Sequence, residues 1–426
     1  MSEKAILEEE YENTAVPLHA RKSLLSVSLV WVGFPMIFTG TVTGATIVTG
    51  LGFGKGMLSI LLGNLILFCY VGLLGILSAK KGYSFGLQSA ITFGKKGSMI
   101  VSGFLSTLVI GWFAVQTGLT GHNMNLAFGS NLYLMTFIAG ILYVAVTLIG
   151  VKSLTYIGAV SVPLFLILGC WAVIDATSHS GWSSIVHFSG NSTLSIGVAV
   201  TMVVALFADS GTMAGDFNRW SKNKKDSLIS SSMAFPIANM IAMIFGGLIV
   251  AAASKNADFF QYIASKGGVV SIISIILLFL NLGSVCSHCL YNASVGWSNL
   301  LNKKMRSTAL VLGVIGTIVA ISGAWNHFIQ WLSLLGIVVP PIGAVIIMDQ
   351  FFLRKNADIS SSFRLNAFIG WGVGTLLGFL TEFYAPNLST AFVSLITGGL
   401  AYGILSIIMS KSNGLKESQN LNEKAQ

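Results

Sequence analysis

The chain has 426 residues, of which 54% are hydrophobic and only 9% are charged. Soluble domains carry about 25% charged residues, so this composition excludes a soluble protein, which could not cover its surface at this length. The net charge of +9 does not indicate a nucleic-acid partner, because the basic residues lie in short runs between apolar stretches. We therefore expect a protein of the lipid bilayer with no obligate protein partner.

Twelve apolar stretches are long enough to cross a membrane, because a spanning helix needs about 20 such residues. The expected fold is all-α and integral to the membrane, with about twelve transmembrane helices. The predicted spans are 24–48, 56–79, 98–121, 132–150, 154–177, 195–216, 229–253, 270–296, 308–324, 327–352, 365–382 and 388–409. The amphipathic segment 84–94 is predicted to lie along the cytoplasmic surface of the membrane.

The basic residues indicate an orientation. With the N-terminus inside, 21 of the 24 Lys and Arg residues fall on the inner side, and only Lys55, Lys255 and Lys266 lie outside. Basic loops remain cytoplasmic, so we expect a multi-pass protein of the cell membrane with both termini in the cytoplasm. Residues 1–13 are acidic and polar, unlike a cleavable signal peptide. Together with 415–426, they are predicted to be disordered.

Two spans contain helix-breaking sequences at matching positions. In the first, Val32-Gly33-Phe34-Pro35 includes a proline, which removes a backbone donor and frees a carbonyl upstream. In the sixth, residues 207–212 place a glycine and three side chains able to bond the backbone at mid-membrane. Spans one and six open two five-helix sets, and discontinuous helices in a five-plus-five inverted repeat are typical of transporter sites.

The alternative is that glycine and proline only kink these helices. We expect kinks of that kind at Pro163, Pro236, Pro340 and Pro341. The predicted organisation is a cytoplasmic tail at 1–22, a ten-helix transport core at 23–352, two additional helices at 353–410, and a second cytoplasmic tail at 411–426.

Asp209 alone among the acidic residues is predicted near mid-membrane, and no Lys or Arg shares its depth. A buried carboxyl there is costly, so a functional role is expected. The group could carry a proton, bind a cationic or amino-bearing substrate, or face the N-terminus of a half-helix. The alternative is a neutral carboxyl bonded to free backbone.

Spans three, six and eight contain aromatic or polar side chains that could line a binding site. Trp112 lies in the middle of span three and Phe207 precedes the break in span six, and flat heterocycles stack on such aromatic faces. The alternative is that Trp112 only packs against neighbouring helices. In span eight, Asn281, Ser284 and His288 share one helical face, which has to meet a cavity or another helix. His288 either titrates or is packed and hydrogen-bonded.

The four cysteines lie inside apolar spans and indicate small membrane hydrophobes, not a disulfide framework. Cys286, His288 and Cys289 do not form a metal site, because the histidine points away from the face that the cysteines share. No catalytic cluster or soluble domain is visible. Residues 50–55 lack the spacing of a phosphate-binding loop, so we expect neither an enzyme nor an ATP-driven pump. Broken helices at mid-membrane also favour a carrier over a channel.

Short stretches in a consistent order resemble the nucleobase–cation symporter family of purine, cytosine, allantoin and hydantoin permeases, and the cytosine permeases most closely. The likeness runs from His19 to about residue 350. The matching stretches are 20–22, Gly63-Asn64, Gly111-Trp112-Phe113, 210–212, Asp216-Phe217, Leu280-Asn281, Leu290-Tyr291, 340–343 and Asp349.

The resemblance implies the leucine-transporter fold, with ten core helices in two inverted repeats plus two more. It implies import of a nucleobase or related small N-heterocycle such as cytosine, with a sodium ion or a proton and no other cofactor. The residues implied beside the substrate are Trp112, Phe207, Asp209, Ser210, Val109 and Cys286. Those implied for sodium are carbonyls near Gly33 and Ile37 and oxygens of Asn281 and Ser284.

Three positions depart from the family pattern. Val285 stands where a hydroxyl residue usually binds sodium, and a hard cation wants oxygen ligands. Val109 replaces a glutamine and Asp209 replaces a serine of the cytosine permeases. We therefore hypothesise that Asp209 has taken over coupling by proton, or that it pairs with a more basic amino-heterocycle. The competing hypothesis is an amino-acid or amine carrier of the same fold.

Overall fold

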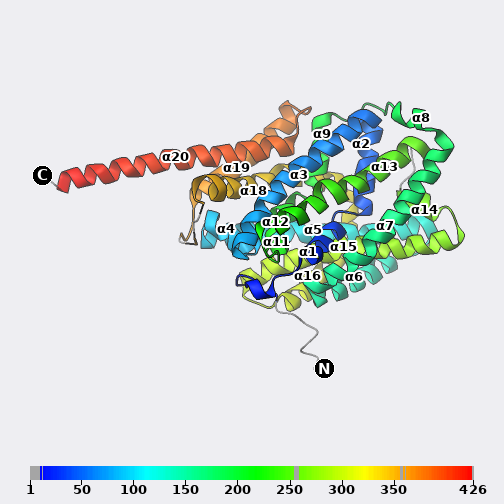
Figure 1. Ribbon diagram of the computed structural model, residues 1–426, viewed down its shortest axis with the longest axis horizontal. Coiled ribbons are helices and arrows are strands. Elements are labelled where there is room, and N and C mark those ends of the chain that lie inside the picture. The colour runs from blue at the N-terminus through cyan, green and yellow to red at the C-terminus, as the bar shows by residue number, and fades with distance from the viewer. Residues whose placement is uncertain (1–9, 12, 254–258, 356–357, 360, 425–426) are drawn as a thin grey trace, which may run out of the picture.

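The computed structural model describes residues 10–11, 13–253, 259–355, 358–359 and 361–424. Within these residues the chain is a bundle of helices, and α20 projects from one end of it (Figure 1). An isolated β-bridge joins Lys22 to Ser221.

The first half of the chain forms one broken helix followed by long continuous ones. Its elements are η2 (Leu18–Ala20), α1 (Leu24–Gly33), α2 (Phe38–Leu51), α3 (Phe53–Lys81), α4 (Phe85–Phe93), α5 (Lys95–Phe128), α6 (Leu132–Ile149), α7 (Val151–Ser180) and α8 (Trp182–Val186). The short α4 lies in the amphipathic segment 84–94.

The second half begins with another broken helix. Its elements are α9 (Ile196–Ala205), α10 (Ala208–Thr212), α11 (Gly215–Asn218), α12 (Lys224–Ser232), η3 (Met233–Ala238), α13 (Asn239–Ala253), α14 (Phe259–Ala264), α15 (Gly268–Leu301), α16 (Met305–Ile321), η4 (Ala324–His327), α17 (Phe328–Val338), α18 (Pro340–Ile347), η5 (Met348–Leu353), α19 (Leu365–Tyr384) and α20 (Thr390–Lys424).

Helix occupies each of the twelve predicted spans. Within the described residues, nine helices are long and apolar enough to cross a membrane, and the bent pair α1 and α2 gives a tenth. The shorter apolar helices α9 and α16 fall in the other two predicted spans. Phe235, which lies inside η3 and precedes Pro236, has backbone angles outside the helical region, whereas Pro163 lies within the continuous α7.

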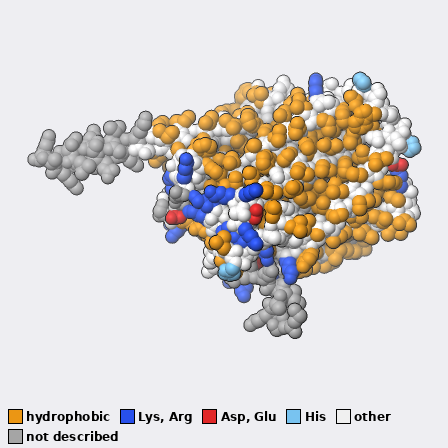
Figure 2. All heavy atoms as spheres, viewed as in Figure 1, with side chains coloured by type: hydrophobic (Ala, Val, Ile, Leu, Met, Phe, Trp, Pro, Cys, Tyr) orange, Lys and Arg blue, Asp and Glu red, His pale blue; other side chains and the backbone are white. Residues whose placement is uncertain are grey.

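Hydrophobic side chains cover most of the face seen in Figure 2, as expected of a surface that meets lipid. Lys and Arg gather near the end from which α20 and the N-terminal segment emerge. Inside the bundle, α2 and α13 approach closely through glycine. A Cβ at Gly44 would lie 2.0 Å from the Met243 carbonyl oxygen, and one at Gly246 would lie 1.8 Å from that of Thr41. Small residues permit this backbone contact between membrane helices.

The N-terminal segment is packed at Glu10 and Tyr11, where the sequence predicted disorder. Residues 1–9 and 12 of that prediction lie outside the described residues. Glu10 is only 2% exposed. Its carboxylate accepts hydrogen bonds from Val151 N at 3.0 Å and from the Tyr291 hydroxyl at 2.8 Å. The fully buried Arg219 donates to the carbonyls of Glu10 and Tyr11, each at 2.9 Å.

This segment therefore connects the start of α7, the middle of α15 and the end of the sixth span. Burial raises the pKa of Glu10 above its ordinary value, although Tyr291, Val151 and Arg219 oppose the shift. An acid with a raised folded-state pKa stabilises the fold most when protonated. That contribution is lost as pH rises through the raised pKa.

Arg219→Ala should lower the stability of the protein by about 3–5 kcal/mol, because it removes the buried positive charge that both Glu10 and Asp216 face. The thermal midpoint of the purified protein measures this. Lys222→Ala, at an exposed site one turn further on, should leave the midpoint unchanged. Equal midpoints for both variants would show that the buried network does not stabilise the fold.

The C-terminal end also differs from its prediction of disorder. The backbone of α20 continues as helix to Lys424, and residues 425–426 lie outside the described residues. Residues 415–424 contain no proline or glycine and several good helix formers, so a helix that has already begun in the membrane can extend through them.

Candidate functional site

The first span is broken where the sequence predicts it. Helix α1 ends at Gly33, α2 begins at Phe38, and the two differ in direction by 54°. Pro35 lies in the gap and cannot donate to the helix. Carbonyl groups at the end of α1 are thereby left without intrahelical partners.

The polar face of α15 meets these carbonyls. The Ser284 hydroxyl donates to the Gly33 carbonyl at 2.6 Å, and Nδ2 of Asn281 donates to the Met36 carbonyl at 2.6 Å. Nε2 of His288 lies 3.0 Å from the Val30 carbonyl. The prediction that Asn281, Ser284 and His288 share one face is confirmed, and that face is turned toward the first break.

His288 is packed as well as hydrogen-bonded. Its Nδ1 lies 2.6 Å from the Ser284 carbonyl, and its ring stacks on Phe34 at a centroid distance of 5.1 Å and an interplanar angle of 18°. Both ring nitrogens thus face carbonyl acceptors. This environment favours the interpretation of His288 as a residue that holds α15 against α1.

The predicted sodium residues are only partly brought together. Gly33, Asn281 and Ser284 meet, whereas the Ile37 carbonyl accepts from the backbone N–H of Gly40 and Thr41 inside α2. The carbonyl that Asn281 contacts is that of Met36, one residue earlier in the break.

The donor set at this break fits sodium poorly. The Phe38 N–H donates to Oδ1 of Asn281 at 2.8 Å, which fixes the amide so that its N–H group faces the Met36 carbonyl. Val285 is buried at 2% exposure and adds no oxygen. A hard cation needs several oxygen ligands, whereas here two span-one carbonyls are satisfied by side-chain hydrogen donors.

The sixth span breaks at Phe207, between α9 and α10, where φ is −132° and ψ is 20°. The discontinuity predicted for this span is therefore confirmed. The Phe207 ring makes an edge contact with Phe34 of the first break, at a centroid distance of 5.1 Å. The two breaks consequently face one another inside the bundle.

Asp209 is completely buried just after this break. Its Oδ1 accepts from the Ser210 N–H at 2.7 Å, whereas Oδ2 has no hydrogen-bond partner among the described residues. The Trp112 indole lies beside this carboxyl, and its Nε1–H makes no well-aligned hydrogen bond to any described residue. Buried polar atoms are normally satisfied, so this acceptor and donor can pair with each other or with a ligand that lies between them.

Trp112 is 3% exposed. Its ring also contacts that of Phe328 edge to face, at a centroid distance of 5.8 Å. Val109 is buried one turn earlier on α5. Cys286 is also buried, and its Sγ lies 3.5 Å from the Thr117 hydroxyl, which places it against a later turn of α5. Cys286 of α15 thus packs against α5.

Two neighbouring residues, Cys289 and Gln116, were not predicted from the sequence. Cys289 lies beside Ser210 and Asp209. Gln116 is buried, and its Oε1 accepts from the Thr39 hydroxyl at 2.5 Å. The helical spacing offered a signal in both cases, because Gln116 lies four residues after Trp112 and Cys289 lies three after Cys286.

Two broken helices that face one another within a bundle of apolar helices define a membrane transporter. The comparisons agree. Residues 15–370 match the family described as permeases for cytosine/purines, uracil, thiamine and allantoin, and the chain belongs to this family of nucleobase–cation symporters. It is a multi-pass membrane permease and not an enzyme.

Among curated relatives, the cytosine permease of Escherichia coli strain K12 is 29% identical over 399 residues, covering 93% of this chain and 94% of the relative. Among solved structures, the transporter Mhp1 in a closed conformation with bromovinylhydantoin bound is 16% identical, with a TM-score of 0.78 and coverage of 94% and 96%. MhsT in complex with L-phenylalanine is 15% identical, with a TM-score of 0.58 and coverage of 91% and 99%. These likenesses show the leucine-transporter-like fold.

Proposed function

We propose that this permease imports a nucleobase or related small N-heterocycle, and that transport is coupled to a proton carried by Asp209. The observation that carries the proposal is the unpaired Asp209 Oδ2 next to the unpaired Trp112 N–H at the meeting point of two broken helices. A flat heterocycle presents a face for stacking on Trp112. Its edge presents donors and acceptors that match these two atoms.

The relatives support this substrate class. The curated relative is named for cytosine, and Mhp1 holds bromovinylhydantoin. We further propose that residues 23–352 form the transport core, that 353–410 add two helices, and that both termini are cytoplasmic. The distribution of Lys and Arg supports that orientation.

The geometry of the first break supports proton rather than sodium coupling. Asn281 and Ser284 donate hydrogen bonds to the carbonyls that sodium would need, and Val285 supplies no oxygen. Asp209 offers a group that can change charge at the substrate site. When Asp209 is protonated, its carboxyl can donate a hydrogen bond to the substrate. When the proton is released, the carboxylate is charged again, which favours the conformation in which the site is open to water.

An amino-acid or amine carrier is the second candidate, because a lone carboxylate also pairs with an ammonium group. Thermal stability separates the two, since a ligand that binds the folded state raises the midpoint by mass action. We expect purified protein to be stabilised by cytosine or another nucleobase in a pH-dependent, sodium-independent manner. Stabilisation by an amine or amino acid alone would contradict the proposal, and enhancement by sodium would reject proton coupling.

A further inference from the structure

A cavity of about 690 Å³ lies where three spans reach one surface of the membrane. It is bounded by Leu353 at the end of η5, Leu365 at the start of α19 and Ser410 at the end of the apolar part of α20. The cavity is remote in the chain from both helix breaks. Because these spans end here, we expect the cavity to lie at the boundary between the hydrocarbon core and water.

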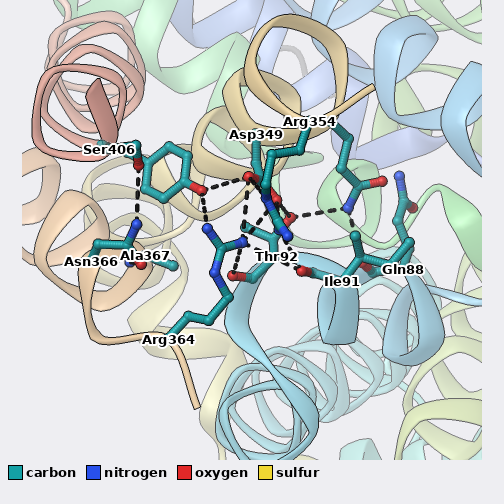
Figure 3. A network of polar contacts seen from close by, with 11 residues as sticks. Gln88, Ile91, Thr92, Asp349, Arg354, Arg364, Asn366, Ala367 and Ser406 are labelled. Carbon is teal, nitrogen blue, oxygen red and sulfur yellow. Dashed lines mark hydrogen bonds and ion pairs between the residues drawn. The ribbon is translucent and has the colours of Figure 1, made fainter. Parts of the chain in front are cut away.

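The polar wall of this cavity is a charge cluster around Asp349 (Figure 3). Asp349 is fully buried, whereas the side chains of Arg354 and Arg364 are 31% and 14% exposed. Nη2 of Arg354 lies 2.6 Å from the carboxylate and Nη1 of Arg364 lies 3.2 Å from it. Two guanidinium groups therefore share one carboxylate, which leaves one net positive charge.

The carboxylate has no capacity for further donors. It also accepts from the Thr92 hydroxyl at 2.8 Å and from the Tyr402 hydroxyl at 2.5 Å, and an ionised carboxylate offers about four acceptor sites. The arginines do have spare donors. Among the described contacts, Nη1 of Arg354 and Nε of Arg364 have no acceptor.

Another part of the wall is apolar and exposed on the surface of the bundle. It includes Phe363, Leu365 and Met409, which are 46%, 63% and 52% exposed. The cavity thus combines spare guanidinium donors with hydrocarbon surface at the end of membrane spans. An amphiphile with an anionic head matches both parts.

We infer that this cavity binds the phosphate group of an anionic phospholipid, with the acyl chains along the apolar wall. Arginine binds phosphate oxygens through charge-assisted hydrogen bonds, and basic pockets between membrane helices at a membrane surface hold anionic head groups. Because the net charge is positive, an anionic lipid is favoured over a zwitterionic one. The bound lipid would brace α19 and α20 against the end of η5.

The test uses the full chain, purified and depleted of lipid in a neutral detergent. Its thermal midpoint is measured with phosphatidylglycerol, with phosphatidylcholine and with inorganic phosphate. We expect a rise with phosphatidylglycerol that the other two do not produce. An equal rise with phosphatidylcholine would reject a head-group site, and an equal rise with inorganic phosphate would assign the site to a soluble anion.

Two variants locate the effect. Ser406 lines the cavity, so Ser406→Phe fills part of it and removes the hydrogen bond that Asn366 donates to the Ser406 hydroxyl. Measured against the variant's own lipid-free midpoint, the response to phosphatidylglycerol should be lost. Arg354→Gln should weaken lipid binding about fivefold. The matched control Lys152→Gln removes an exposed charge elsewhere and should leave the response intact. A full response in Ser406→Phe would overturn the proposal.

Discussion

Asp209→Asn should abolish accumulation of substrate against a gradient, reducing uptake by at least about 100-fold, which corresponds to about 2.7 kcal/mol. Asparagine preserves the size of the side chain and an oxygen that can accept from the Ser210 N–H, but it cannot release a proton. The measurement is uptake of radiolabelled cytosine, adenine and guanine into proteoliposomes at several pH values.

Asp175→Asn is the matched control for this variant. Asp175 is an acid near the end of α7 whose carboxylate pairs with Lys266, far along the chain from the helix breaks, and the control should transport normally. Substrate exchange without a proton gradient separates binding from coupling, because Asp209→Asn should retain more exchange than accumulation. Normal uptake by Asp209→Asn with an unchanged pH profile would contradict the proton hypothesis.

Trp112→Ala should weaken substrate binding by roughly 10- to 100-fold, because stacking of a base on an aromatic side chain contributes about 1–3 kcal/mol. Trp112→Phe keeps an aromatic face but loses the unpaired N–H, so we expect a smaller loss. Competition binding on purified protein measures both variants. A substrate whose edge has no acceptor for the indole N–H should bind the parent protein and Trp112→Phe with equal affinity.

Folding has to be controlled in this comparison, because deleting a buried tryptophan costs about 3–5 kcal/mol of stability. Affinity is therefore measured only on monodisperse protein. Trp182→Ala, at a position that is 61% exposed on α8, should leave binding unchanged. Unaltered affinity in Trp112→Ala would remove this residue from the substrate site.

The two broken helices could be predicted because their cause is local. Pro35 lacks a donor wherever it stands in a helix, and the run from Phe207 to Thr212 offers competing backbone partners. Asp209 was recognisable for a similar reason, since an acid in an apolar span is costly in any arrangement. Periodicity likewise identified the polar face of α15 without knowledge of what it contacts.

The features that the sequence did not predict depend on contacts between segments that are far apart in the chain. Glu10 is polar and close to the N-terminus, so its sequence is typical of a solvated tail, and only the positions of Arg219 and Tyr291 explain its burial. The buried Gln116 is hydrogen-bonded by Thr39, which lies 77 residues away along the chain. The cluster around Asp349 similarly joins four separate elements, and its two arginines look in the sequence like ordinary basic residues at the ends of spans.

The most direct test of the central claim is proton movement driven by substrate in proteoliposomes that contain no sodium. We expect addition of a transported nucleobase to acidify the lumen of vesicles containing the parent protein. Vesicles with Asp209→Asn should show no such acidification. Substrate uptake that requires sodium and moves no protons would contradict the account and return the coupling site to the carbonyls of Gly33 and Met36.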